Sequence, residues 1–216
     1  MRVILFDDAL AQLATGWQPP CGRPLLALLA TAHDRRPARD AVRAAACTLA
    51  ARWVGSAQAD YLRPDRLPRI VADGADFLVS LAYGNGGNSG DRDDGCALIA
   101  LAPASGHGLA ALGVDLCMNT LPDDWDDIAR LYFAPSVRAA LAKTEPQHRA
   151  EAFAQAWSQL EACNKAACID LTEWHSGLAT VHGQITTISP DLPAFFANGW
   201  RAALALILAP SRPIAT

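Results

Sequence analysis

Four apolar runs of strand length set the limits on what this chain can fold into. They are Phe77–Tyr83, Cys96–Ala102, Leu109–Leu116 and Ala202–Ala209. A buried strand takes about 4–8 apolar residues and a membrane-spanning helix takes roughly 20, so these runs predict strands and exclude a transmembrane segment. The glycine- and aspartate-rich residues 84–95 separate the first two runs and predict a hairpin with a long connection. A further strand is predicted over Leu178–Ser189.

Helical segments alternate with these strands. Helices are predicted over three segments: Pro37–Trp53, Asp123–Tyr132 and Pro135–Lys143. Another helix is predicted to open with a capping box of Thr144 and Gln147 and to run to about Ala167. The order of elements favours an α+β fold of two similar halves, residues 1–108 and 109–216.

Composition narrows the class of protein. The 216 residues are 51% hydrophobic and 19% charged, which is enough for a packed core and excludes a disordered chain. A net charge of −4 lacks the basic field that nucleic-acid binding needs. The six cysteines form no Cys-x-x-Cys pair, so free thiols in a reducing cytoplasm are expected. Four apolar residues followed by Asp7 and Asp8 do not fit the core of a signal peptide.

Arginines are concentrated in residues 35–69, where eight of them stand against three aspartates. Helical spacing places Arg36, Arg39 and Arg43 together, on a face separate from the apolar one. Such a face is either solvated or binds an anion.

A helix in the second half carries the most distinctive set of polar residues. Trp157, Glu161 and Lys165 stand four residues apart, so Glu161 and Lys165 share one flank of the buried stripe. The simpler interpretation is an ion pair that supports the helix by about 0.2–0.5 kcal/mol. A predicted strand that contains an acid, Asp115, precedes this helix in the chain.

These segments resemble the 4′-phosphopantetheinyl transferases of the surfactin-synthetase-activating type. The matching residues are Leu112-Gly113-Val114-Asp115-Leu116, Tyr132-Phe133-Ala134-Pro135 and Trp157-Ser158-Gln159-Leu160-Glu161-Ala162-x-x-Lys165. The resemblance covers the second half well and the first half in outline. It implies the α+β fold of that family, a pseudo-dimer of two similar halves within one monomeric chain.

The resemblance also implies a reaction. The family moves the phosphopantetheine arm of coenzyme A to a serine of an apo acyl or peptidyl carrier protein and releases adenosine 3′,5′-bisphosphate. Asp115 and Glu161 are expected to bind Mg²⁺, which prefers one or two carboxylates with phosphates and water. Glu161 or a metal-bound water is expected to be the base for the serine, and Lys165 to stabilise the leaving phosphate. The expected coenzyme A-binding residues are Arg36, Arg39, Arg43, Arg66, Arg69, Tyr83 and Lys165.

Three positions depart from the family pattern. Cys117 stands where many members carry a second acid, and a thiol is a poor Mg²⁺ ligand. Ala82 and Tyr83 stand where the family has a serine and a histidine that meet the phosphates. The Gly-Lys-Pro motif of the family has no clean match, and Arg66 or Arg69 is expected to replace its lysine.

These departures keep two alternatives to an active transferase open. One is a relative that binds coenzyme A or a carrier protein without transfer, and the other is an unrelated α+β enzyme or structural protein.

The loop at residues 84–95, with Arg92, is the expected source of replacement phosphate donors. His107, between Gly106 and Gly108, is interpreted as a loop histidine rather than a base. His175 and His182 have no partner acid or thiol at a readable spacing and are interpreted as structural. A cluster at a helix N-terminus is interpreted as favoured by the helix dipole: Asp123, Asp124, Asp126 and Asp127.

Overall fold

The computed structural model describes most of the chain and arranges it around two sheets. The described residues are 1–16, 19, 23–31, 35–62, 67–84, 95–105, 108–197 and 199–209. The larger sheet has the strand order β1-β2-β6-β5-β4-β3. Its strands are β1 (Ile4–Leu5), β2 (Leu25–Thr31), β3 (Asp60–Leu62), β4 (Arg69–Ala72), β5 (Ala75–Gly84) and β6 (Gly95–Pro103). β1 is parallel to β2, and the other pairs are antiparallel.

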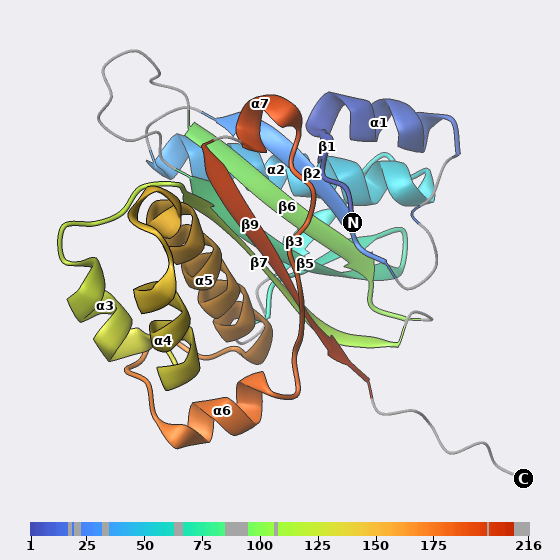
Figure 1. The fold of residues 1–216 in the computed structure, drawn as a ribbon. Helices are drawn as coiled ribbons and strands as arrows, with labels where there is room; N and C mark the ends of the chain where they lie inside the picture. Colours follow the sequence, from blue (N-terminus) through green and yellow to red (C-terminus); the bar gives the residue numbers. More distant parts are fainter. Residues whose placement is uncertain are drawn as a thin grey trace, which may run out of the picture.

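Two helices, α1 (Phe6–Ala14) and α2 (Arg35–Val54), cover one face of this sheet (Figure 1). β6 is buried almost throughout because its alternate side chains enter two different cores. Ala97, Ile99 and Leu101 pack with the helices, whereas Leu98 and Ala100 pack with the second sheet. The continuous apolar run of this strand therefore reflects burial on both faces.

The smaller sheet is antiparallel and has the order β7-β9-β8. Its strands are β7 (Leu109–Met118), β8 (Thr186–Ile188) and β9 (Trp200–Leu208). Leu112, Val114 and Leu116 face the first sheet, and α5 (Pro146–Ala167) packs on the opposite face of β7 and β9. The remaining helices are α3 (Trp125–Tyr132), α4 (Pro135–Lys143), α6 (Ser176–His182) and α7 (Ala194–Ala197). None of the described helices is long and apolar enough to cross a membrane.

An aromatic cluster joins the N-terminal half of α5 to α3. Phe153 and Trp157 stack with ring centroids 6.3 Å apart, and Phe133 packs against both rings. This cluster holds the third and fourth turns of α5 and so helps to set the direction in which the helix crosses the small sheet.

The mixed α+β class is confirmed, and so are the helices over residues 37–53 and 135–143 and the antiparallel hairpin of β5 and β6. The connection of that hairpin, with Arg92, lies outside the described residues. The strand predicted over Leu178–Ser189 is wrong, because its first part belongs to α6 and only Thr186–Ile188 is extended. Leu178, the one buried residue of this short helix, packs inward, so the tertiary contact overrides the strand preference of the threonines and valine that follow.

The predicted capping box is also wrong. The Thr144 hydroxyl donates backwards to the Ala140 carbonyl at 3.0 Å, at the end of α4. α5 begins instead at Pro146 after Glu145, which makes no side-chain cap. Proline is favoured at this first position because the helix needs no N–H donor there.

Candidate active site

The site begins with an unusually close contact between α5 and β7. A Cβ atom placed on Gly113 would lie 2.6 Å from the Ala166 nitrogen and closer still to the Ala162 carbonyl oxygen. Only glycine therefore allows the helix to lie at this distance from the strand. The small side chains of Ala162 and Ala166, both buried, complete the contact.

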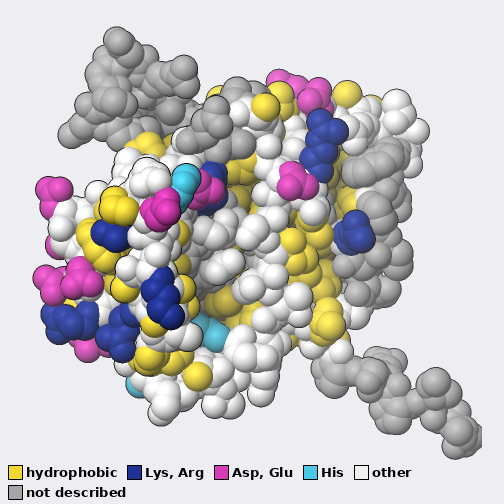
Figure 2. Space-filling model, viewed as in Figure 1, with side chains coloured by type: hydrophobic (Ala, Val, Ile, Leu, Met, Phe, Trp, Pro, Cys, Tyr) yellow, Lys and Arg dark blue, Asp and Glu magenta, His cyan; other side chains and the backbone are white. Residues whose placement is uncertain are grey.

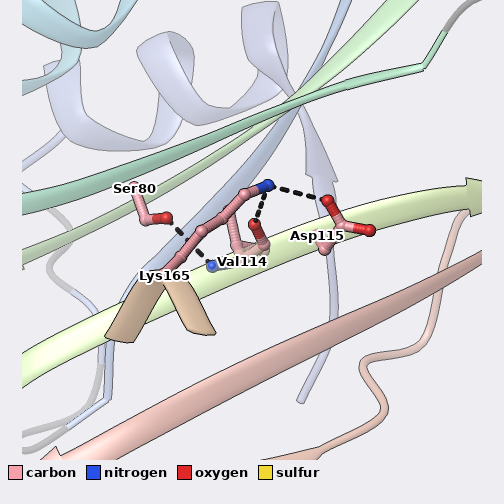
Figure 3. A network of polar contacts seen from close by, with 4 residues as sticks. All are labelled: Ser80, Val114, Asp115 and Lys165. Atoms are coloured by element: carbon pink, nitrogen blue, oxygen red, sulfur yellow. Dashed lines mark hydrogen bonds and ion pairs between the residues drawn. The ribbon is translucent and has the colours of Figure 1, made fainter. Parts of the chain in front are cut away.

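Because α5 and β7 lie so close, the Lys165 side chain of α5 reaches the backbone of β7. Its Nζ donates to the Asp115 carboxylate at 2.7 Å and to the Val114 carbonyl at 3.0 Å (Figure 3). β7 is an edge strand, so alternate residues direct their N–H and C=O groups away from β9. At Val114 both groups bond to side chains. The carbonyl accepts from Lys165, and the N–H donates to the Ser80 hydroxyl of β5 at 3.0 Å.

Asp115 and Glu161 line one hollow of about 390 Å³, which we call the carboxylate hollow. Burial raises the pKa of the Asp115 carboxyl, and Lys165 partly opposes that shift. Burial also raises the pKa of Glu161, and the nearby Asp115 charge raises it further. No hydrogen bond or ion pair to the Glu161 carboxylate is found among the described residues. The two acids therefore form a site whose negative charge Lys165 only partly balances.

Three aromatic side chains, Tyr83, Trp157 and Trp200, also line this hollow. Cys117 also lines it, and burial followed by the Asp115 charge raises the pKa of its thiol to about 12. A protonated thiol is a weak metal ligand. In the described part of the chain, no group of three or more His, Cys, Asp or Glu side chains is arranged to hold a metal ion.

A second hollow, of about 600 Å³, includes Lys165 in its lining and is called the anion hollow here. Arg39 and Arg43 of α2 line it together with Lys165. The Arg43 guanidinium lies 5.5 Å above the ring of Tyr61 and 3.6 Å from Asp40. Three cationic side chains in its lining give the hollow the character of a phosphate site. Among the described residues, the lining is Arg39, Arg43, Tyr61, Pro68, Val79, Ser80, Leu81, Tyr83, Leu112, Asn164, Lys165, Cys168, Ile169 and Asp170.

Tyr83 lines both hollows. Burial raises the pKa of its phenol, so the group is neutral at pH 7 and acts as a hydrogen-bond donor or acceptor without charge. Ala82, next to it, is fully buried in the core between the sheets and takes no part in either hollow.

Other predicted residues lie elsewhere. Arg69 does not line either hollow, because its guanidinium pairs with the Asp76 carboxylate at 2.5 Å. Arg36 belongs to α2, but its side chain lies outside the described residues, as do Arg66 and His107.

The acidic cluster of α3 stays at the surface. Asp126 and Asp127 occupy its first turn, as the dipole interpretation predicts. Asp127 pairs with Arg130, and acidic and basic side chains gather over this part of the molecule (Figure 2). None of the four acids lines the carboxylate hollow.

Sequence reasoning missed Ser80, Tyr61 and Asn164 as lining residues. Asn164 occupies the buried stripe of α5 and is 3% exposed, with its Oδ1 3.1 Å from Nε2 of His182. Its place one residue before Lys165 was the only signal in the sequence. Ser80 and Tyr61 carried none, because their role depends on strands that meet only in the folded chain.

The fold and the site together define a mixed α+β protein with a strand-and-helix carboxylate pair beside a cationic hollow. Residues 111–199 match the family model of the 4′-phosphopantetheinyl transferase superfamily. This stretch contains Asp115, Glu161 and Lys165, and its match supports the superfamily that the sequence motifs predicted. The match does not distinguish the surfactin-synthetase-activating subtype. No curated protein matches the chain.

Proposed function

We propose that this protein transfers the 4′-phosphopantetheine arm of coenzyme A to a serine of an apo acyl or peptidyl carrier protein. The observation that carries the proposal is the position of Lys165, which lines the anion hollow with Arg39 and Arg43 and pairs with Asp115 of the carboxylate hollow. Glu161 lines the carboxylate hollow together with Asp115. A diphosphate that is attacked by a hydroxyl needs cationic contacts on its oxygens and a base for the attacking group.

The carboxylate pair fits a hard divalent cation. Mg²⁺ takes one or two carboxylates and completes its shell with phosphates and water. Asp115 and Glu161 would hold the cation, whose charge would offset the burial and the Asp115 charge that together raise the pKa of Glu161. When bound there, Mg²⁺ would neutralise charge on the diphosphate oxygens.

The residues of this chain then take separate parts in the transfer. Arg39 and Arg43 bind the phosphates of coenzyme A and fix its orientation. Glu161 accepts the proton of the carrier serine, whose oxygen forms the new bond to phosphorus. Lys165 stabilises the charge on the departing adenosine 3′,5′-bisphosphate as the diphosphate bridge breaks.

The proposal includes the two-half, monomeric organisation of the surfactin-synthetase-activating type. The strands of the larger sheet end at Pro103 and those of the smaller one begin at Leu109, which supports division into halves near residue 108. It also places the protein in the cytoplasm, where coenzyme A and carrier proteins occur. Five described cysteines are free thiols, which agrees with a reducing compartment.

The test is a mass-shift assay. Several apo carrier proteins are incubated with coenzyme A and Mg²⁺, and transfer adds one phosphopantetheine to the carrier. Asp115→Asn and Glu161→Gln are expected to lower the rate by at least 100-fold. Asp127→Asn, which removes an exposed acid that pairs only with Arg130, is the matched control and is expected to keep the wild-type rate. A Glu161→Gln enzyme with near wild-type turnover would remove that residue from the mechanism.

One observation favours a second candidate, binding without transfer. Cys117 occupies the hollow where the family pattern has another acid, and its thiol stays protonated. A relative of this kind would bind coenzyme A in the anion hollow yet modify no carrier at any Mg²⁺ concentration. Calorimetry with coenzyme A, run beside the mass-shift assay, separates the two functions.

A further inference from the structure

Ser80 is a buried hydroxyl on the wall of the anion hollow. Its side chain is 5% exposed, and its Oγ accepts the Val114 N–H at 3.0 Å. A serine hydroxyl carries one donor and two acceptor sites. No acceptor for the Ser80 hydroxyl hydrogen is found among the described residues. The hydroxyl therefore keeps an unused donor in a place where water has little access.

The groups around the Ser80 hydroxyl determine which acceptor its hydrogen can reach. Val114 occupies the side of the oxygen that faces β7, so the hydrogen is free to turn toward the hollow. Arg39, Arg43 and Lys165 line the same hollow and select an anion. A neutral O–H among three cationic side chains adds a directed contact to a phosphate oxygen.

Packing alone does not require this hydroxyl. Ala82 lies two residues along the same face of β5 and is fully buried against the second sheet with only a methyl group. The face therefore accepts an apolar side chain next to β7, whereas the hydroxyl at position 80 coincides with the edge of the hollow.

We propose that Ser80 is a substrate-binding residue whose hydroxyl donates to a phosphate oxygen of coenzyme A while its Oγ continues to hold Val114. This inference rests on the proposed function only in taking coenzyme A as the ligand. The arrangement forms a chain from the phosphate through Ser80 to Val114, whose carbonyl in turn holds Lys165 (Figure 3). Donation to the phosphate strengthens the same oxygen as an acceptor, because linked hydrogen bonds polarise one another.

The experiment compares coenzyme A binding by calorimetry, without added divalent cation, in wild type and three variants. Ser80→Ala is expected to weaken binding about 10- to 100-fold, the range for a lost hydrogen bond to a charged group. Ser80→Thr keeps the hydroxyl and is expected to stay within about 3-fold of wild type. Ser158→Ala is the matched control, since it removes another buried serine hydroxyl that donates only within α5 and lines neither hollow. If Ser80→Ala does not fold, Ser80→Cys replaces it, because a thiol of similar size is a weak donor.

Dephospho-coenzyme A then locates the contact. A loss in Ser80→Ala that is confined to coenzyme A assigns the hydroxyl to the 3′-phosphate, and an equal loss with both ligands assigns it to the diphosphate. Either result supports the proposal. Unchanged affinity in Ser80→Ala, with a lower Tm, would show that the serine serves only Val114 and would overturn it.

Failure of this inference and failure of the proposed function give different results. Wild type that binds coenzyme A but labels no carrier refutes transfer and leaves the role of Ser80 to the calorimetry. Wild type that labels carriers, with Ser80→Ala binding coenzyme A equally well, refutes the inference alone. Absence of binding to wild type at millimolar coenzyme A contradicts both.

Discussion

Gly113→Ala is expected to damage both stability and activity, because the added methyl group meets main chain rather than a movable side chain. The new Cβ would lie 2.6 Å from the Ala166 nitrogen and closer still to the Ala162 oxygen, whereas real Cβ atoms keep at least 3.0 Å. α5 must therefore move away from β7 by about 0.5–1 Å. Overpacking of this kind costs about 1–3 kcal/mol.

The same movement reaches the site. Lys165 bonds Asp115 at 2.7 Å and the Val114 carbonyl at 3.0 Å, so a shift of the helix stretches both contacts toward the limit of a hydrogen bond. Weakening them adds about 1 kcal/mol, for a total of about 2–4 kcal/mol. For a chain of this size that lowers Tm by about 4–16 °C. A misplacement of about 1 Å near reacting groups reduces the rate by about 100-fold.

Thermal unfolding and the mass-shift assay measure the two effects. Gly177→Ala is the matched control, because a Cβ there meets only the ring of His175 and alanine favours the helix. Ala162→Gly is not expected to rescue Gly113→Ala, since the clash involves the Ala162 carbonyl and not its methyl group. A Gly113→Ala protein with wild-type Tm and wild-type turnover would refute the packing argument.

Three further predictions concern the charged groups. Without metal, the Glu161 carboxyl of the folded protein is expected to titrate at a pH above its ordinary value of 4.5. In metal-free protein the free energy of unfolding is expected to fall as the pH rises from the ordinary to the raised pKa of Glu161, because the folded state holds the Glu161 proton more tightly than the unfolded chain does. Glu161→Gln is expected to remove that fall and to raise Tm at pH 7 in thermal scans. Lys165→Met is expected to raise the pKa of Asp115 further and to slow transfer by 100-fold or more in the mass-shift assay. Arg39→Ala with Arg43→Ala is expected to weaken coenzyme A binding and its salt dependence, measured by calorimetry at two ionic strengths; unchanged salt dependence would contradict the phosphate role.

The parts of the structure that follow from local pattern were predictable from the sequence. The four-residue spacing of Glu161 and Lys165 places them on one flank of α5 whatever the helix packs against. The approach of Asp115 to Lys165 was predictable only by resemblance, because it depends on the close contact at Gly113.

Long-range pairing was not readable in the same way. Arg69 carries the same charge as Arg39 and Arg43, yet it lies on β4 where the hairpin with β5 brings Asp76 within reach. The competing carboxylate lies seven residues away in the chain and at no helical or strand spacing that signals a pair. The composition shows only that residues 35–69 are rich in arginine. The strand register, which brings Asp76 beside Arg69, explains why Arg69 does not line the anion hollow as Arg39 and Arg43 do.

The site lies beside β7 because this edge strand has backbone groups that need side-chain partners. β7 has a strand neighbour on one side only, so the outward N–H and C=O of Val114 need partners from elsewhere in the chain. Ser80 and Lys165 supply them, and each of these side chains also lines the anion hollow. Satisfying the open edge thus places a hydroxyl and an ammonium group in the anion hollow, and the ammonium group also bonds an acid of the carboxylate hollow. The buried carboxylate of Asp115, next along the strand, then depends on that ammonium group for its charge, which is why one lysine serves the fold, the acid and the proposed phosphate site together.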